Sequence, residues 1–260
     1  MLRKQRPVGH EDRLTLVEHL DELRTRIVIA VFAFVAALIL CFWQNHLLLD
    51  IINDPLPPHQ TPITLSPTEP FTTTLTVSAY AAILIALPIV LYQLYAFILP
   101  AFSPRERKVA TPLLLMVPFL FIAGAVFAYF VIIPAALKFL LHFNASQFNT
   151  QIRARDYYSF VTLTMISAGV VFQLPVGVLG LVRMGITTPE KLRRNRRYAF
   201  LGCAVVAAAL PGVDPVSMLI EMVPLVLLYE LSILLARVFG RTASDADAPD
   251  PDRLASAEGS

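Results

Sequence analysis

The sequence is poor in charge for its length. Only 15% of its 260 residues are charged, against about 25% in an ordinary soluble domain, whereas 56% are hydrophobic. A soluble globule of this composition would lack the polar surface to cover its core. Composition also excludes disordered, collagen-like and disulfide-rich chains, and a net charge of +2 without a basic face gives no support for nucleic-acid binding. A polytopic membrane protein remains.

Catalytic and metal-binding signatures are absent as well. The sequence has no H-E-x-x-H, G-x-S-x-G, Walker A or G-x-G-x-x-G motif, and its five histidines are scattered in tails and connections. The two cysteines, Cys41 and Cys203, belong to no motif and are interpreted as small apolar fillers. We therefore expect no enzyme activity, no metal site and no cofactor. A secondary transporter for a small solute stays open as an alternative function, with Gln173 and Glu221 as its candidate polar groups.

Six apolar segments predict six transmembrane helices, and hence an all-α membrane protein. The predicted spans, which together make a domain over 27–236, are 27–43, 75–99, 109–133, 160–182, 198–210 and 216–236. As a helix the fifth covers only about 20 Å of a hydrocarbon layer about 30 Å thick, so it stops short or thins the bilayer locally. We expect residues 1–26 to form a tail with an amphipathic interfacial helix, and 237–260 to form a second tail, disordered from about 242.

The Lys and Arg residues determine the expected orientation. Eighteen of the 21 flank one side of the predicted spans, and the three on the other side are Lys138, Arg153 and Arg155. Under the positive-inside rule, both termini are expected in the cytoplasm. The outer connections, 44–74 and 134–159, are expected to be structured, and six prolines forbid a regular helix through most of the first.

Several polar residues have both a structural and a functional interpretation. Glu22 precedes Arg26 by four residues, which is the spacing of a stabilising helical pair. Glu106 completes a capping box with Ser103 at the start of the third span. Gln173, in the middle of the fourth span, is the kind of amide that bonds two helices together. The residues alone leave these alternatives open.

Small residues and capping signals add local expectations. Three glycines of the fourth span are expected to let neighbouring helices approach closely: Gly169, Gly177 and Gly180. Thr188 followed by Pro189 predicts the start of a helix before the fifth span, because Thr is a good N-cap and Pro suits the first helical position.

Five short segments form a recognisable set. They are His19–Arg26 before the first span, Leu91–Phe97 with Pro100 and Glu106–Lys108, Phe172–Val176, Met184–Thr187 with Pro189–Glu190, and Asp214 with Glu230 around the last span. Together with six spans and two cytoplasmic termini, this set resembles the TatC family, the polytopic core of the twin-arginine protein translocase. The resemblance covers residues from about 14 to 240.

The resemblance implies a wall of six helices, the last two short, and a function in protein export. Family members bind twin-arginine signal peptides at the cytoplasmic face and assemble with TatA- and TatB-type single-span proteins into homo- and hetero-oligomers within membrane lipid. Folded proteins then cross the cytoplasmic (inner) membrane of a prokaryote, driven by the proton-motive force. The implied signal-binding residues are Glu22 and Glu106, with Arg24, Phe97 and Arg107 in the same matching segments.

The sequence departs from the family pattern in its second half. Gln173 stands where the family commonly has Glu, so a proton-titrating role is not expected at this position. Met218 replaces a polar residue of the last span, and Glu221 appears one turn later. Because the family binds partner helices in this region, we expect Gln173, Asp214, Met218 and Glu221 to form a partner-helix contact.

Overall fold

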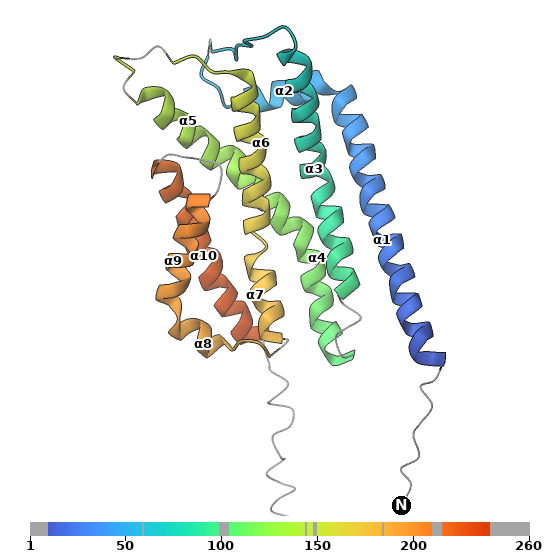
Figure 1. The fold of residues 1–260 in the computed structure, drawn as a ribbon. Helices are drawn as coiled ribbons and strands as arrows, with labels where there is room; N and C mark the ends of the chain where they lie inside the picture. The colour runs from blue at the N-terminus through green and yellow to red at the C-terminus, as the bar shows by residue number, and fades with distance from the viewer. Residues whose placement is uncertain are drawn as a thin grey trace, which may run out of the picture.

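The protein is a bundle of long helices (Figure 1). The computed structural model describes residues 10–58, 60–98, 104–143, 145–147, 150–183, 185–209 and 215–239; the side chains of 10–19, 98, 104–114, 183, 217, 238 and 239 lie outside the description. The helices are α1 (His10–Trp43), α2 (Asn45–Asn53), α3 (Glu69–Ile98), α4 (Pro104–Phe127), the π-helical η2 (Ala128–Ile132), α5 (Ile133–His142), α6 (Ala154–Val171), α7 (Leu174–Arg183), α8 (Pro189–Arg194), α9 (Arg196–Ala209) and α10 (Pro215–Phe239).

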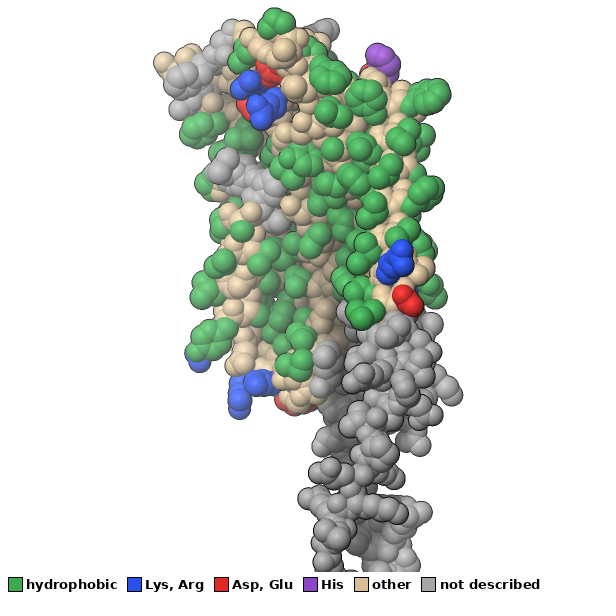
Figure 2. Space-filling view, turned by 45° about the vertical axis from the view of Figure 1, so that its right-hand side comes forward, with side chains coloured by type: hydrophobic (Ala, Val, Ile, Leu, Met, Phe, Trp, Pro, Cys, Tyr) green, Lys and Arg blue, Asp and Glu red, His purple; other side chains and the backbone are tan. Residues whose placement is uncertain are grey.

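Long apolar stretches make this a membrane fold. Among the described residues, five stretches are long and apolar enough to cross a membrane: Leu20–Trp43, Glu69–Phe97, Leu115–His142, Ala154–Val182 and Met218–Arg237. Figure 2 shows hydrophobic side chains over the height of the bundle, with most of the charged ones near its two ends. The predicted all-α membrane fold is confirmed. Helix α9, which corresponds to the predicted fifth span, has 14 residues and is short as predicted, whereas α10, with 25 residues, is longer than the resemblance implied.

The helices run alternately between two ends of the bundle. The start of α1, the end of α3, the start of α4, α8 and the end of α10 lie at one end, which we call the inner end (Figure 1). The opposite end, which carries α2 and the start of α6, is called the outer end. Helices α4, η2 and α5 cross the bundle obliquely from the inner end to the outer end.

Helix α1 stands at the edge of the bundle and packs mainly on α3 (Figure 1). Its buried residues, among the described side chains, are Ala37 and Cys41, both in its outer part. They pack against Ala81 and Ala82 of α3, and such small residues let the two helix backbones approach closely. The inner part of α1 is much more exposed.

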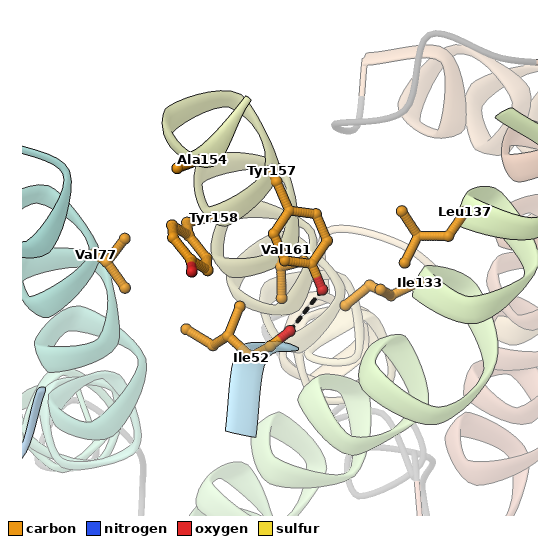
Figure 3. Close-up of a cluster of buried hydrophobic side chains, with 8 residues drawn as sticks. All are labelled: Ile52, Val77, Ile133, Leu137, Ala154, Tyr157, Tyr158 and Val161. Atoms are coloured by element: carbon orange, nitrogen blue, oxygen red, sulfur yellow. Dashed lines mark hydrogen bonds between the residues drawn. The ribbon is translucent and has the colours of Figure 1, made fainter. Parts of the chain in front are cut away.

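The outer end contains the main hydrophobic cluster, shown in Figure 3. It joins residues of α2, α3, α5 and α6, namely Ile52, Val77, Ile133, Leu137, Ala154, Tyr157, Tyr158 and Val161. Two tyrosine hydroxyls donate to carbonyls in the last turn of α2: Tyr157 to Ile52, and Tyr129 to Ile51, both at 2.6 Å. The last carbonyls of a helix have no intrahelical partner, so these bonds satisfy them and attach α2 to the bundle.

An outer clamp, formed by Ile63, Glu69 and residues 152–154, ties the first outer connection to α3 and α6. The Ile63 backbone N–H donates to the Ile152 carbonyl at 2.8 Å, and the Ala154 N–H donates to the Ile63 carbonyl at 2.9 Å. The Nε of Arg153 donates to Glu69 Oε1 at 2.8 Å. This hydrogen bond, together with the carboxylate charge, raises the pKa of Arg153. The expectation of structured outer connections is confirmed.

The first outer connection is more helical than its prolines predict. Residues 45–53 form α2 because they precede the first proline of the connection, Pro55. Helix α3 begins at Glu69, before the predicted start at 75. Pro70 at the second helical position is compatible with a helix start, and Glu69 Oε2 accepts from the Leu65 N–H at 2.7 Å.

Prolines also explain where the third and fourth spans differ from the prediction. The third continues through η2 and α5 to His142. Its wider π turn ends at Ile132, two residues before Pro134, which has no N–H to donate. The fourth begins at Ala154 and is interrupted between Val171 and Leu174, where the prediction had one continuous helix. Pro175 cannot donate to the carbonyl of residue 171 and its ring would clash with it, so the helix breaks there.

Candidate functional site

The inner end of α1 holds a polar cluster of Glu22, Arg26 and Gln93. The guanidinium of Arg26 pairs with Glu22, its Nε donating to Oε1 at 3.1 Å and its Nη2 contacting the same oxygen. Its Nη1 donates to Oε1 of Gln93 on α3 at 3.1 Å. The side chains of Glu22 and Arg26 are 35% and 22% exposed, so the carboxylate is reachable from outside the bundle. The predicted helical pair therefore exists, and it also connects α1 to α3.

Gln93 was not among the predicted site residues, although it lies within the Leu91–Phe97 segment. Gln93 is four residues before Phe97 on α3, so the two side chains share one helix face. Phe97 is half-buried and lies one turn closer to the inner end than Gln93. The signal that could have identified Gln93 is a polar side chain on that face, four residues from a candidate residue.

Of the remaining predicted signal-binding residues, only Arg24 has a described side chain. It is exposed on α1, two residues from Glu22. The backbone of α4 begins at Pro104, in agreement with the predicted helix start, but the side chains of Glu106 and Arg107 lie outside the described residues. The structure therefore brings Glu22, Arg24 and Phe97 to one end of the bundle. That the carboxylate of Glu106 lies beside them stays a prediction.

Gln173 lies in the break between α6 and α7 and is 8% exposed. Its Nε2 donates to the Val117 carbonyl of α4 at 3.1 Å, so the amide bonds two helices, which is its structural interpretation. Its Oε1 is buried and has no hydrogen-bond partner among the described residues. Of the glycines beside it, Gly169 packs closely against Phe121, whereas Gly177 and Gly180 have open space, so close packing at those two was wrongly predicted.

The predicted partner-helix residues are mostly turned into the bundle. Glu221 is 2% exposed within this chain, and Met218 packs beside the cluster of Cys203, Ala207 and Leu225 that joins α9 to α10. Asp214 lies outside the described residues. A partner would therefore meet the outer faces of α9 and α10 before it met the carboxyl group of Glu221.

The inner end of α10 is tied to the segment that enters α9. Arg196 Nη2 donates to Glu230 Oε2 at 2.5 Å, and the Tyr229 hydroxyl donates to the Leu192 carbonyl at 2.9 Å. The predicted helix start at Thr188 is confirmed, because its side chain accepts from the Lys191 N–H and α8 begins at Pro189. These contacts hold the basic segment 191–197 against α10.

Nothing in the described part of the chain resembles a metal centre. No group of three or more His, Cys, Asp or Glu is placed to hold a metal ion within those residues. Cys41 and Cys203 are both buried and unbridged, on different helices. The polar cluster at the inner end presents a partly exposed carboxylate beside a guanidinium and an amide.

One family model matches most of the chain, over residues 18–224: Sec-independent protein translocase protein (TatC). The TatC protein of Aquifex aeolicus is 36% identical over 233 residues, which cover 88% of this chain and 97% of that protein. The chain belongs to the TatC family. The chloroplastic TATC protein of Pisum sativum is 34% identical over 233 residues, or 89% of this chain and 66% of that protein.

Solved structures of TatC proteins have the same fold as this chain, in agreement with its membership of the family. Two crystal structures described as the twin-arginine translocase receptor TatC superpose with TM-scores of 0.73 and 0.70, at 36% and 35% identity. They cover 84% and 86% of this chain and 98% and 100% of their own chains. As a TatC protein the chain is a multi-pass membrane component of a protein translocase and not an enzyme. The alternative of a small-solute transporter does not fit this family.

Proposed function

We propose that this TatC protein is the receptor and core subunit of a twin-arginine translocase. It binds twin-arginine signal peptides at its inner end, in the cytoplasmic membrane of a prokaryote, and works with TatA- and TatB-type single-span partners in lipid. Export of folded proteins uses the proton-motive force. The observation that carries the proposal is the accessible Glu22 carboxylate, already bound to a guanidinium, in a chain similar to receptors of this name.

The chemistry of the ligand explains this choice of residues. A guanidinium carries a permanent charge and a planar fork of donors, for which a carboxylate is the natural acceptor. A lysine keeps the charge but loses the fork. Because an apolar segment follows the arginines of the signal, the acceptors must lie at a membrane boundary, and Glu22 sits where the apolar stretch of α1 begins. Exposed pairs contribute only about 0–1 kcal/mol each, so the apolar segment must add affinity.

The proposed orientation places the inner end in the cytoplasm. It is supported by the excess of Lys and Arg on that side of the predicted spans. A reporter that is active only outside the cytoplasm should be active when fused at residue 60 or 146, and silent at 105, 190 or 245. An active fusion at 105 would contradict this orientation.

Site-specific cross-linking tests the receptor function. A photoreactive residue placed at position 25 of α1, beside Glu22, should capture a twin-arginine peptide and capture the matched twin-lysine peptide much less. The reason is that only the guanidinium forms a forked pair with a carboxylate. The same reaction with the probe at position 219, an exposed position of α10, should capture a single-span partner, which tests the partner contact expected on the outer faces of α9 and α10. Equal capture of both peptides at position 25 would rule out the proposed recognition.

A further inference from the structure

The carboxylate proposed to receive the signal is already occupied by this chain's own arginine. Arg26 contacts Glu22 Oε1 through both Nε and Nη2, and uses Nη1 for the Gln93 amide oxygen. The guanidinium therefore presents two donors to Glu22 and a third to the neighbouring helix. Both of these donors share Oε1 of the carboxylate, an atom that an incoming arginine would also use, so a ligand guanidinium competes with Arg26 for Glu22.

The geometry allows such an exchange. Arg26 and Glu22 lie one turn apart on the same helix face, and both side chains are partly exposed, at 22% and 35%. The bond of Arg26 to Gln93 uses Nη1, whereas the contacts with Glu22 use Nε and Nη2. While the pair is intact, Gln93 also orients the guanidinium and reduces its rotamer freedom, which makes Arg26 a more effective competitor.

We infer that Arg26 is an internal competitor for Glu22, which sets the affinity that a signal peptide must reach in order to bind. This inference rests on the proposed receptor function. Exchange breaks the pair of Glu22 with Arg26 and forms a pair of Glu22 with the ligand's arginine. Much of the binding free energy from a single ligand arginine is therefore cancelled. A ligand binds well only if it brings further contacts, such as a second arginine and an apolar segment. Ligands with lysine, which lacks the fork, fall below the threshold.

Competition makes a quantitative statement about variants. The cost of displacing Arg26 is the same for every ligand that uses Glu22, so removing Arg26 should raise all such affinities by one common factor. The ratio between twin-arginine and twin-lysine peptides should stay constant. A residue that contacted the signal directly would instead lose affinity when replaced, and a purely structural pair would change neither affinity.

The test measures binding of fluorescent twin-arginine and twin-lysine peptides to the full chain in lipid nanodiscs. Arg26→Gln should tighten the binding of both peptides about three- to fivefold, which corresponds to the loss of one partly exposed pair. Arg26→Lys, which keeps the charge without the fork, should give a smaller gain. Arg194→Gln is the matched control, because it removes the same charge from an exposed position of α8 at the same end, and should leave both affinities within about twofold.

Each other outcome has a definite meaning. Weaker or unchanged binding by Arg26→Gln, with normal discrimination by the unaltered chain, overturns the competitor role and leaves the receptor function standing. Equal binding of both peptides by the unaltered chain overturns the receptor function and the inference with it. Unfolding temperatures of all variants are measured in parallel. If Arg26→Gln does not fold, the smaller gain expected for Arg26→Lys decides the question, and its absence rejects the inference.

Discussion

Replacing Glu22 and Glu106 together by glutamine should abolish capture of a twin-arginine peptide while the protein accumulates normally in the membrane. Glutamine keeps the helix at position 22 and the capping box at position 106, so only two negative charges are lost. Each lost charge-assisted pair at a partly desolvated site costs about 1.5–3 kcal/mol, so two should reduce affinity by about two decades or more. Peptide cross-linking and membrane abundance are measured on the same samples.

The single variants separate recognition from local structure. Glu22→Gln also removes the partner of Arg26, but a partly exposed pair contributes only about 1 kcal/mol or less, so folding should be little affected. Glu106→Gln alone should reduce capture of the peptide less than the double variant does. Normal export of a twin-arginine reporter by the double variant would remove both residues from the site and leave pairing and capping as their roles.

A second large effect is expected at the crossing of α4 and α6. A methyl group added by Gly124→Ala would lie 2.7 Å from the Ala168 carbonyl oxygen and 2.9 Å from the Gly169 Cα, both backbone atoms that cannot turn aside. The two helices must move apart, and overpacking of this kind costs about 1–3 kcal/mol. The unfolding temperature in detergent and the folded yield should both fall.

Gly177→Ala provides the matched control for this change. Gly177 lies within α7, and an added Cβ would have nothing within 4 Å. Alanine is the better helix former there, so the variant should be neutral or more stable by about 0.5–1 kcal/mol. If Gly124→Ala were as stable as Gly177→Ala, the close approach of α4 and α6 would be refuted.

Long apolar segments and a low content of charged residues predicted the class of fold, because the bilayer demands long apolar helices with satisfied backbones. The extents of the helices were less predictable. Proline was interpreted as a helix breaker in 44–74, yet Pro70 lies in the first turn of α3, where proline is tolerated. In contrast, Pro175 interrupts a run that hydropathy alone presents as continuous. The same residue type thus has opposite effects, depending on its position in the helix.

The candidate site was predictable only where its contacts are local. The pair of Glu22 and Arg26 follows from a spacing of four residues, and the Thr188 cap follows from its neighbours. Gln93 lies 67 residues from Arg26 along the chain, and such a contact depends on how α1 packs against α3. The pairing of Arg196 with Glu230 is likewise a consequence of tertiary packing, since 34 residues separate them.

Helix α1 is buried only in its outer part, so its inner part can tilt about that contact. The fixed point of such a tilt is near Ala37 and Cys41, where α1 is buried against α3. Glu22 lies fifteen residues away, about 22 Å along the helix, so a tilt of about 10° at the fixed point displaces the carboxylate by about 4 Å. The hydrogen bond between Arg26 and Gln93 holds the inner end of α1 to α3. Loss of that bond would let the inner end of α1 move away from α3, while the outer part of α1 stayed packed against α3.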